Sequence, residues 1–94
     1  MAQILQQESH WHIDGEVVFN NVSSLLETAT NFNSAQPTVI DFAKVTNVDT
    51  SAISLMLEWQ RRAMMAHSSV SFVNLSPNLI SLANLYGVED IISQ

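Results

Sequence analysis

The histidines are the first residues whose type could support chemistry. His10 and His12 are two residues apart, so on a strand they would share one face and could together hold a metal ion. Metal sites generally recruit three or four ligands, however, and no carboxylate stands at a helpful spacing from this pair. His67 stands alone in a turn-like stretch. We therefore predict ordinary surface histidines and no bound metal.

Nucleophiles and phosphate-binding loops are the next possibility. The chain has no cysteine, and none of its serines lies in a G-x-S-x-G sequence, which presents the nucleophile of many hydrolases. A phosphate-binding loop needs closely spaced glycines, but the two glycines, Gly15 and Gly87, are far apart. The sequence therefore predicts neither an enzyme nor a cofactor site.

The junction Asp49-Thr50-Ser51 lies between a β-branched stretch and a strongly apolar helical pattern. Threonine is a favoured N-cap, whose hydroxyl accepts a hydrogen bond from a free backbone N–H at a gain of about 0.5–2 kcal/mol. A hydroxyl at a helix start is also accessible, and a phosphate there would meet free N–H groups and the positive end of the helix dipole. Two interpretations follow: Thr50 caps the helix, or Thr50 is a position where a partner docks or a kinase acts.

Hydrophobic spacing predicts the elements that position this junction. Two short strands are expected over residues 3–7 and 11–14, the second ended by a turn at Gly15. The expected elements that follow are a helix from Val22, a buried strand over 38–42, a helix from Thr50 to about Ala66, a strand over 70–75 and a helix over 77–86. The order β-β-α-β-α-β-α predicts an α/β fold in a single domain, residues 1–94, with helices flanking a sheet.

The helix expected from Thr50 has two apolar sides. Its main stripe is expected to hold Ala52, Ile53, Met56, Leu57, Gln60, Ala63 and Met64. Leu55 lies nearly opposite this stripe, Trp59 lies at its edge, and Arg62 is close to Leu55. Either Leu55 and Trp59 pack against a neighbouring helix, or the three residues form an exposed patch of residue types enriched at binding hot spots.

The charge balance limits the possible partners. The formal net charge is −6, and the only basic residues are Lys44, Arg61 and Arg62. Binding to phosphates or to anionic lipid requires many basic side chains, so the sequence predicts neither a nucleic-acid partner nor direct membrane binding. No apolar run approaches the roughly 18–20 residues that span a bilayer, and the first residues do not resemble a signal peptide. We expect a cytosolic protein.

Two longer stretches resemble the STAS family (sulfate transporter and anti-sigma factor antagonist). "VIDFAKVTNVDTSAISLMLEWQRRA" is similar to the family's strand, acid–hydroxyl junction and long helix, and "VNLSPNLISLANLYGVEDII" is similar to its last strand and helix. The resemblance covers residues 37–92 and implies a STAS-like fold with a mixed four-stranded sheet and no catalytic activity. In the anti-sigma antagonist branch, the hydroxyl directly after the aspartate is phosphorylated by a partner kinase, and Thr50 occupies that position here.

Within the family, "VDT" followed by "LANLY" is most similar to the small cytosolic subunits of Mla-type phospholipid-transport ABC systems. The resemblance implies a subunit that binds the ATPase subunit of the ABC transporter, in a complex with permease and substrate-binding subunits. Such a subunit would be cytoplasmic and peripheral to the inner membrane through its partner. The residues expected to bind this partner, or to correspond to the phospho-acceptor site, are Asp49, Thr50, Ser51, Leu55, Trp59 and Arg62.

The alternative function is an anti-sigma factor antagonist that is switched by phosphorylation of Thr50. The family usually has a glycine just after the hydroxyl residue or two residues after it, where this chain has Ser51 and Ala52. Glycine would allow the closest approach of a kinase, so its replacement weakens the switch hypothesis more than the docking hypothesis.

Overall fold

A computed structural model describes residues 2–29, 31–32, 34–88 and 90 of the 94-residue chain. Its elements are β1 (Gln3–Gln7), β2 (His10–Val17), α1 (Val22–Thr28), β3 (Thr38–Val48), α2 (Thr50–Met65), β4 (Val70–Val73) and α3 (Pro77–Leu85). The predicted order of strands and helices is therefore confirmed.

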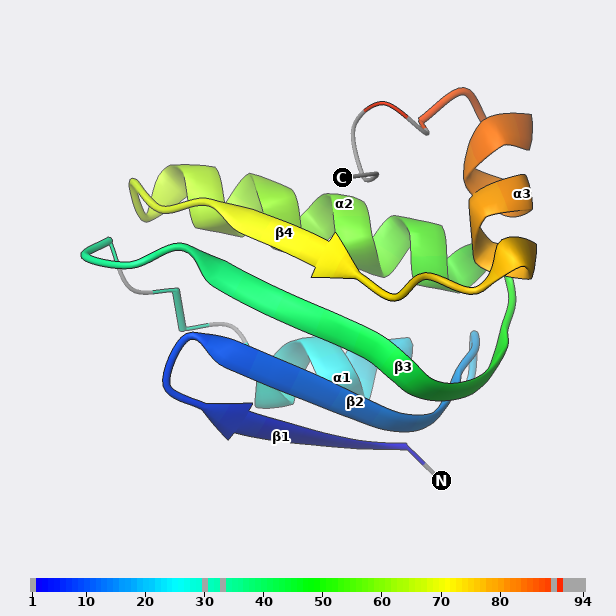
Figure 1. Ribbon diagram of the computed structural model, residues 1–94, viewed down its shortest axis with the longest axis horizontal. Helices are drawn as coiled ribbons and strands as arrows, with labels where there is room; N and C mark the ends of the chain where they lie inside the picture. The colour runs from blue at the N-terminus through cyan, green and yellow to red at the C-terminus, as the bar shows by residue number, and fades with distance from the viewer. Residues whose placement is uncertain (1, 30, 33, 89, 91–94) are drawn as a thin grey trace.

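The four strands form one mixed sheet in the order β1-β2-β3-β4. β1 pairs antiparallel with β2, whereas β2, β3 and β4 run parallel to one another. The parallel pairs are joined by crossovers through α1 and α2, and Figure 1 shows both helices behind the sheet, with α3 beyond one end of it. Among the described residues, no element covers the opposite face of the sheet.

Gly15 lies inside a strand, so the turn predicted at this position is wrong. β2 continues through Gly15 to Val17, and its register with β3 shifts between His12 and Asp14 and again between Gly15 and Glu16. Gly15 has φ of +106°, a conformation that glycine adopts without steric cost. The glycine therefore permits a register irregularity in β2. After it, β2 continues to Val17, whose carbonyl oxygen accepts from the Asp49 N–H just before α2.

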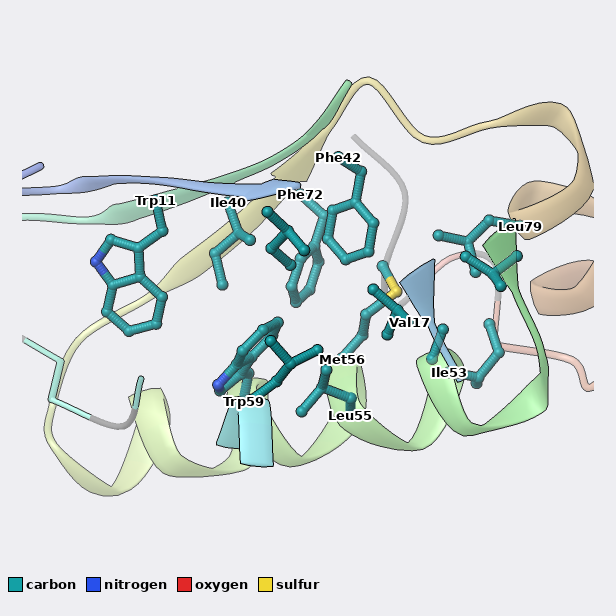
Figure 2. Packing of buried hydrophobic residues seen from close by; sticks show 14 of the residues in the cluster. Trp11, Val17, Ile40, Phe42, Ile53, Leu55, Met56, Trp59, Phe72 and Leu79 are labelled. Atoms are coloured by element: carbon teal, nitrogen blue, oxygen red, sulfur yellow. The ribbon is translucent and has the colours of Figure 1, made fainter. Parts of the chain in front are cut away.

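The core lies between the sheet and α2. Trp11, Ile40 and Phe72 occupy facing positions on three adjacent strands and are buried against the helix. The Trp11 and Trp59 rings meet edge to face with centroids 6.1 Å apart, and Figure 2 shows this contact together with the side chains of the surrounding cluster. Edge-to-face aromatic pairs add about 0.5–1.5 kcal/mol beyond their burial, so this contact helps to fix α2 on the sheet.

The exposed patch considered for Leu55 and Trp59 is wrong, because both side chains are in the core. Leu55 is 3% exposed and Trp59 is 0% exposed, and the Trp59 indole N–H donates to the Ala29 carbonyl oxygen at the end of α1 at 2.7 Å. The alternative interpretation, in which these residues pack against a neighbouring helix, describes the structure. Met64, which was expected in the buried stripe, is instead 74% exposed. The buried stripe is therefore turned toward Leu55 and Trp59 and away from Met64.

Replacing Trp59 should test this assignment. Trp59→Ala should lower the free energy of unfolding by about 3–5 kcal/mol, because it opens a cavity and leaves the Ala29 carbonyl without its donor. Urea-induced unfolding followed by circular dichroism measures the loss. Met64→Ala, on the exposed side of the same helix, is the matched control and should change stability by less than about 0.5 kcal/mol. A Trp59→Ala variant as stable as the wild type would contradict the burial of this side chain.

Candidate functional site at the start of α2

The Asp49 carboxylate joins two segments that are distant in the sequence. Its Oδ1 accepts from the Ser51 backbone N–H at 2.8 Å, and its Oδ2 accepts from the Phe19 backbone N–H at 3.0 Å. The hydrogen bond from Phe19 and those from Ser51 hold the pKa of Asp49 below its ordinary value of 3.8. Asp49, and not Thr50, is therefore the N-cap of α2, which corrects the capping role considered for Thr50.

Thr50 is consequently the first residue of α2, and its hydroxyl is not needed to cap the helix. Its side chain is exposed, and no hydrogen bond links its hydroxyl to any other residue that the structure describes. Ser51, by contrast, is half-buried and bonded to Asp49. Of the three junction residues, Thr50 is the one that a partner can reach with its hydroxyl unengaged.

A hollow of about 380 Å³ begins at Thr50 and runs between α2 and the end of α3. Its lining consists of Thr50, Ile53, Ser54, Leu57, Tyr86 and Val88. The hydroxyls of Thr50 and Ser54 therefore stand beside apolar side chains and the Tyr86 phenol. Such a mixture suits the insertion of a partner side chain that has an apolar body and a polar end.

Large apolar side chains are exposed around this hollow. Tyr86 at the end of α3 is 57% exposed, and Phe19 is 77% exposed on the loop that Asp49 holds beside α2. We define the helix-start surface as Phe19, Thr50, Ser54, Leu57 and Tyr86. Of these five residues, the sequence analysis predicted only Thr50 as a site residue. A bulky apolar side chain directly before the turn residues Asn20 and Asn21 was the signal available for Phe19.

The five side chains of the helix-start surface are uncharged, although the chain carries a net charge of −6 and the Asp49 carboxylate lies beside them. Neither the first half of α2, residues 50–57, nor the segment of residues 74–88 contains an acidic or basic side chain. The cores of protein interfaces are depleted of charge and enriched in tyrosine, tryptophan and phenylalanine. The composition of this surface is therefore that of an interface core.

Arg62 lies apart from Thr50, so the structure does not bring these two predicted site residues together. Twelve residues of helix separate them, a rise of about 18 Å. The Glu58 carboxylate accepts from the side chains of Arg61 and Arg62, with 2.8 Å between Arg62 Nε and Glu58 Oε2. The hydrogen bonds from the two arginines, with Arg61 contributing most, lower the pKa of Glu58 to about 2. Arg62 is thus engaged within its own helix.

The histidine pair belongs to a polar group on the face of the sheet away from the helices. His12 Nδ1 lies 3.5 Å from Asp41 Oδ2, and the Asn74 side-chain amide donates to Asp41 Oδ1 at 3.0 Å. The bond from Asn74 is the main cause of the lowered pKa of Asp41. The sequence analysis missed Asp41, because the partner comes from the neighbouring parallel strand. Among the described residues, no three histidine or acidic side chains are placed to hold a metal ion.

A family model described as "Mlab, STAS domain" matches residues 1–93. This match covers nearly the whole chain, so the protein belongs to the STAS family. Domains of this family are generally non-catalytic regulatory or binding domains. No curated protein sequence matches the chain.

Solved structures share the fold. The anti-sigma factor antagonist SpoIIAA in its unphosphorylated form matches with a TM-score of 0.73 and 16% identity, over 98% of this chain and 85% of that one. Mglu matches with a TM-score of 0.61 and 18% identity, over 80% of this chain and 20% of that one, so this chain corresponds to about a fifth of Mglu. These likenesses confirm the STAS-like fold with its mixed four-stranded sheet.

Replacing Asp49 should test its double role. Asp49→Ala should lower the free energy of unfolding at pH 7 by about 0.5–2 kcal/mol, the usual loss for a helix cap. Because folding lowers the pKa of Asp49, its stabilisation is present above the ordinary value of 3.8 and is lost as the pH falls through the lower folded-state value. The difference between wild type and variant in urea unfolding should therefore shrink from pH 7 to about pH 3. A difference that does not change with pH would contradict a role for the charge.

Proposed function

We propose that this protein is a non-catalytic STAS subunit of a Mla-type phospholipid ABC transporter, and that it binds the ATPase subunit through the helix-start surface. The observation that carries the proposal is the unengaged Thr50 hydroxyl at the edge of an uncharged, partly apolar hollow. The description of the matching family model as "Mlab" supports the choice of partner. The subunit would reside in the cytoplasm, held at the inner membrane by the ATPase.

The chemistry of the helix-start surface favours a protein partner over a lipid surface. A membrane-binding surface presents basic side chains to anionic headgroups, but this surface has none and belongs to a chain of net charge −6. The part of the chain that the structure describes also contains no helix with the length and hydropathy to cross a bilayer. An uncharged partner surface that offers an apolar side chain and hydrogen-bonding groups would complement it.

Docking would act by adding an interface to the ATPase. Tyr86 lines the same hollow as Thr50 and Ser54, and Phe19 is exposed on the loop whose backbone N–H donates to Asp49. The hydroxyls of Thr50 and Ser54 can donate or accept hydrogen bonds. Aromatic anchors of this kind dominate the energy of many interfaces. A dissociation constant of about 1 μM corresponds to about −8 kcal/mol, which a few such anchors can supply. Binding energy of this size would stabilise the folded ATPase and its place in the complex.

A second candidate function is an anti-sigma factor antagonist regulated at Thr50. The favouring observation is that Thr50 is an exposed hydroxyl at the first position of a 16-residue helix, with no role as the cap. A phosphate on Thr50 would lie beside the Asp49 carboxylate, which already accepts the Ser51 and Phe19 N–H groups. Repulsion between the two anions would disturb the helix-start surface and could release a bound partner.

An affinity purification should separate the two functions. We expect the tagged protein, isolated from detergent-solubilised native cells, to recover an ABC ATPase together with its permease, and to carry an unmodified Thr50 by mass spectrometry. Recovery of a soluble kinase with phosphate on Thr50 would instead support the antagonist. Recovery of neither class of partner would contradict both functions.

Variants of the helix-start surface should then weaken binding to the purified ATPase. We expect Tyr86→Ala and Thr50→Ala each to reduce affinity about tenfold or more in calorimetric titration, because each removes a contact at the centre of the interface. Thr28→Ala, an exposed threonine on α1, is the matched control and should bind like the wild type. Thermal melting should show that all three variants remain folded. Full affinity of both helix-start variants would place the interface elsewhere on the molecule.

A further inference from the structure

β1 is an edge strand that the described structure leaves open. Its only strand neighbour is β2, and Figure 1 shows it as the free edge of the sheet, on the side away from β4. Every second residue of an antiparallel edge strand turns its N–H and C=O away from its neighbour. Such groups are satisfied by water or by another strand. The outward backbone N–H and C=O groups of β1 are therefore suited to pair with another β-strand.

The usual protection against strand pairing is missing from β1. Edge strands are commonly guarded by lysine, proline, an inward-pointing charge or a bulge. The sequence of β1, Gln-Ile-Leu-Gln-Gln, contains no charge and no proline, and its pairing with β2 is regular over all five residues.

The side chains of β1 are complementary to a second copy of the same strand. Gln3, Leu5 and Gln7 face away from the core, since they stand opposite Asp14, His12 and His10 in the register with β2. In an antiparallel pair centred on Leu5, the two Leu5 side chains would meet, and Gln3 of each copy would face Gln7 of the other. Leu5 is 56% exposed, so this contact would bury apolar surface. The two glutamine amides of each pair would hydrogen-bond to one another.

The net charge of −6 does not prevent this pairing. The strand itself has no charged side chain, so no like charges would stand opposite one another within the pair. Repulsion between the remaining charges is screened over about 8–10 Å at physiological salt. A second copy is therefore compatible with β1 on electrostatic as well as geometric grounds.

We propose that β1 pairs antiparallel with β1 of a second copy of this chain, so that the two four-stranded sheets become one continuous sheet. Five residues span only about 17 Å, and the interface falls well below the roughly 1,200 Å² of a stable complex. The dimer is therefore weak and forms at high local concentration. It leaves the hollow at Thr50 free, because no residue of β1 lines that hollow.

Sedimentation velocity of the full chain between about 10 μM and 1 mM tests the proposal, since this range covers weak association. The wild type should show a dimer fraction that rises with concentration. Leu5→Lys should abolish it, because two cations would meet at the centre of the pair. Met64→Lys replaces another exposed apolar side chain with the same charge and should leave the dimer unchanged. A wild type that is monomeric throughout, or a dimer insensitive to Leu5→Lys, would overturn the proposal.

A pair of double variants tests the register itself. Gln3→Lys with Gln7→Glu places opposite charges across the proposed interface and should strengthen the dimer at low salt. Gln3→Glu with Gln7→Glu places like charges at the same positions and should abolish it. Equal dimer fractions in the two double variants would exclude the antiparallel register centred on Leu5. Circular dichroism confirms that each variant keeps its fold.

Discussion

The geometry of the helix-start surface depends on the hydrogen bonds of the Asp49 carboxylate. Two crossover connections leave the same end of the sheet, one after β2 and one after β3, and this carboxylate binds a backbone N–H from each. The negative charge also lies at the positive end of the α2 dipole, where it is most favourable. Because Asp49 performs the capping, Thr50 is free. Because the same group binds the backbone N–H of Phe19, it also holds the loop that carries this exposed aromatic residue next to the start of α2.

Most of the fold could be predicted because each element carries a clear local signal. The β-branched run at the start of β3 and the Ser76-Pro77 start of α3 mark their elements without tertiary information, although β3 continues to Val48, beyond the expected end at residue 42. The side of α2 that is buried could not be predicted in this way. Leu55, Met56, Leu57 and Trp59 lie within five residues, so apolar groups surround much of the helix and periodicity alone does not select the buried side. The aromatic partner on β2, Trp11, and the free carbonyl of Ala29 select it.

The candidate site was predictable as a location but not as a set of residues. The acid and the two hydroxyls before an apolar helix marked the junction, yet aspartate and threonine are both favoured caps, and the preference for aspartate is too small to decide the position alone. Asp49 is the cap because its carboxylate has a second oxygen, which accepts from the Phe19 backbone N–H, 30 residues away in sequence. Phe19 and Tyr86 join the site only through tertiary structure. Family resemblance supplied the partner, which physical patterns alone do not identify.

The positions of the two tryptophans determine which changes in the protein its intrinsic fluorescence can detect. The chain has two tryptophans, and both are buried, with their rings in edge-to-face contact. Their fluorescence therefore senses the closure of α2 on the sheet and is a sensitive signal for folding. The helix-start surface contains a tyrosine and a phenylalanine but no tryptophan. A partner that docks there leaves the intrinsic tryptophan spectrum of this chain nearly unchanged, and a dye or a tryptophan in the partner is required to make the encounter visible.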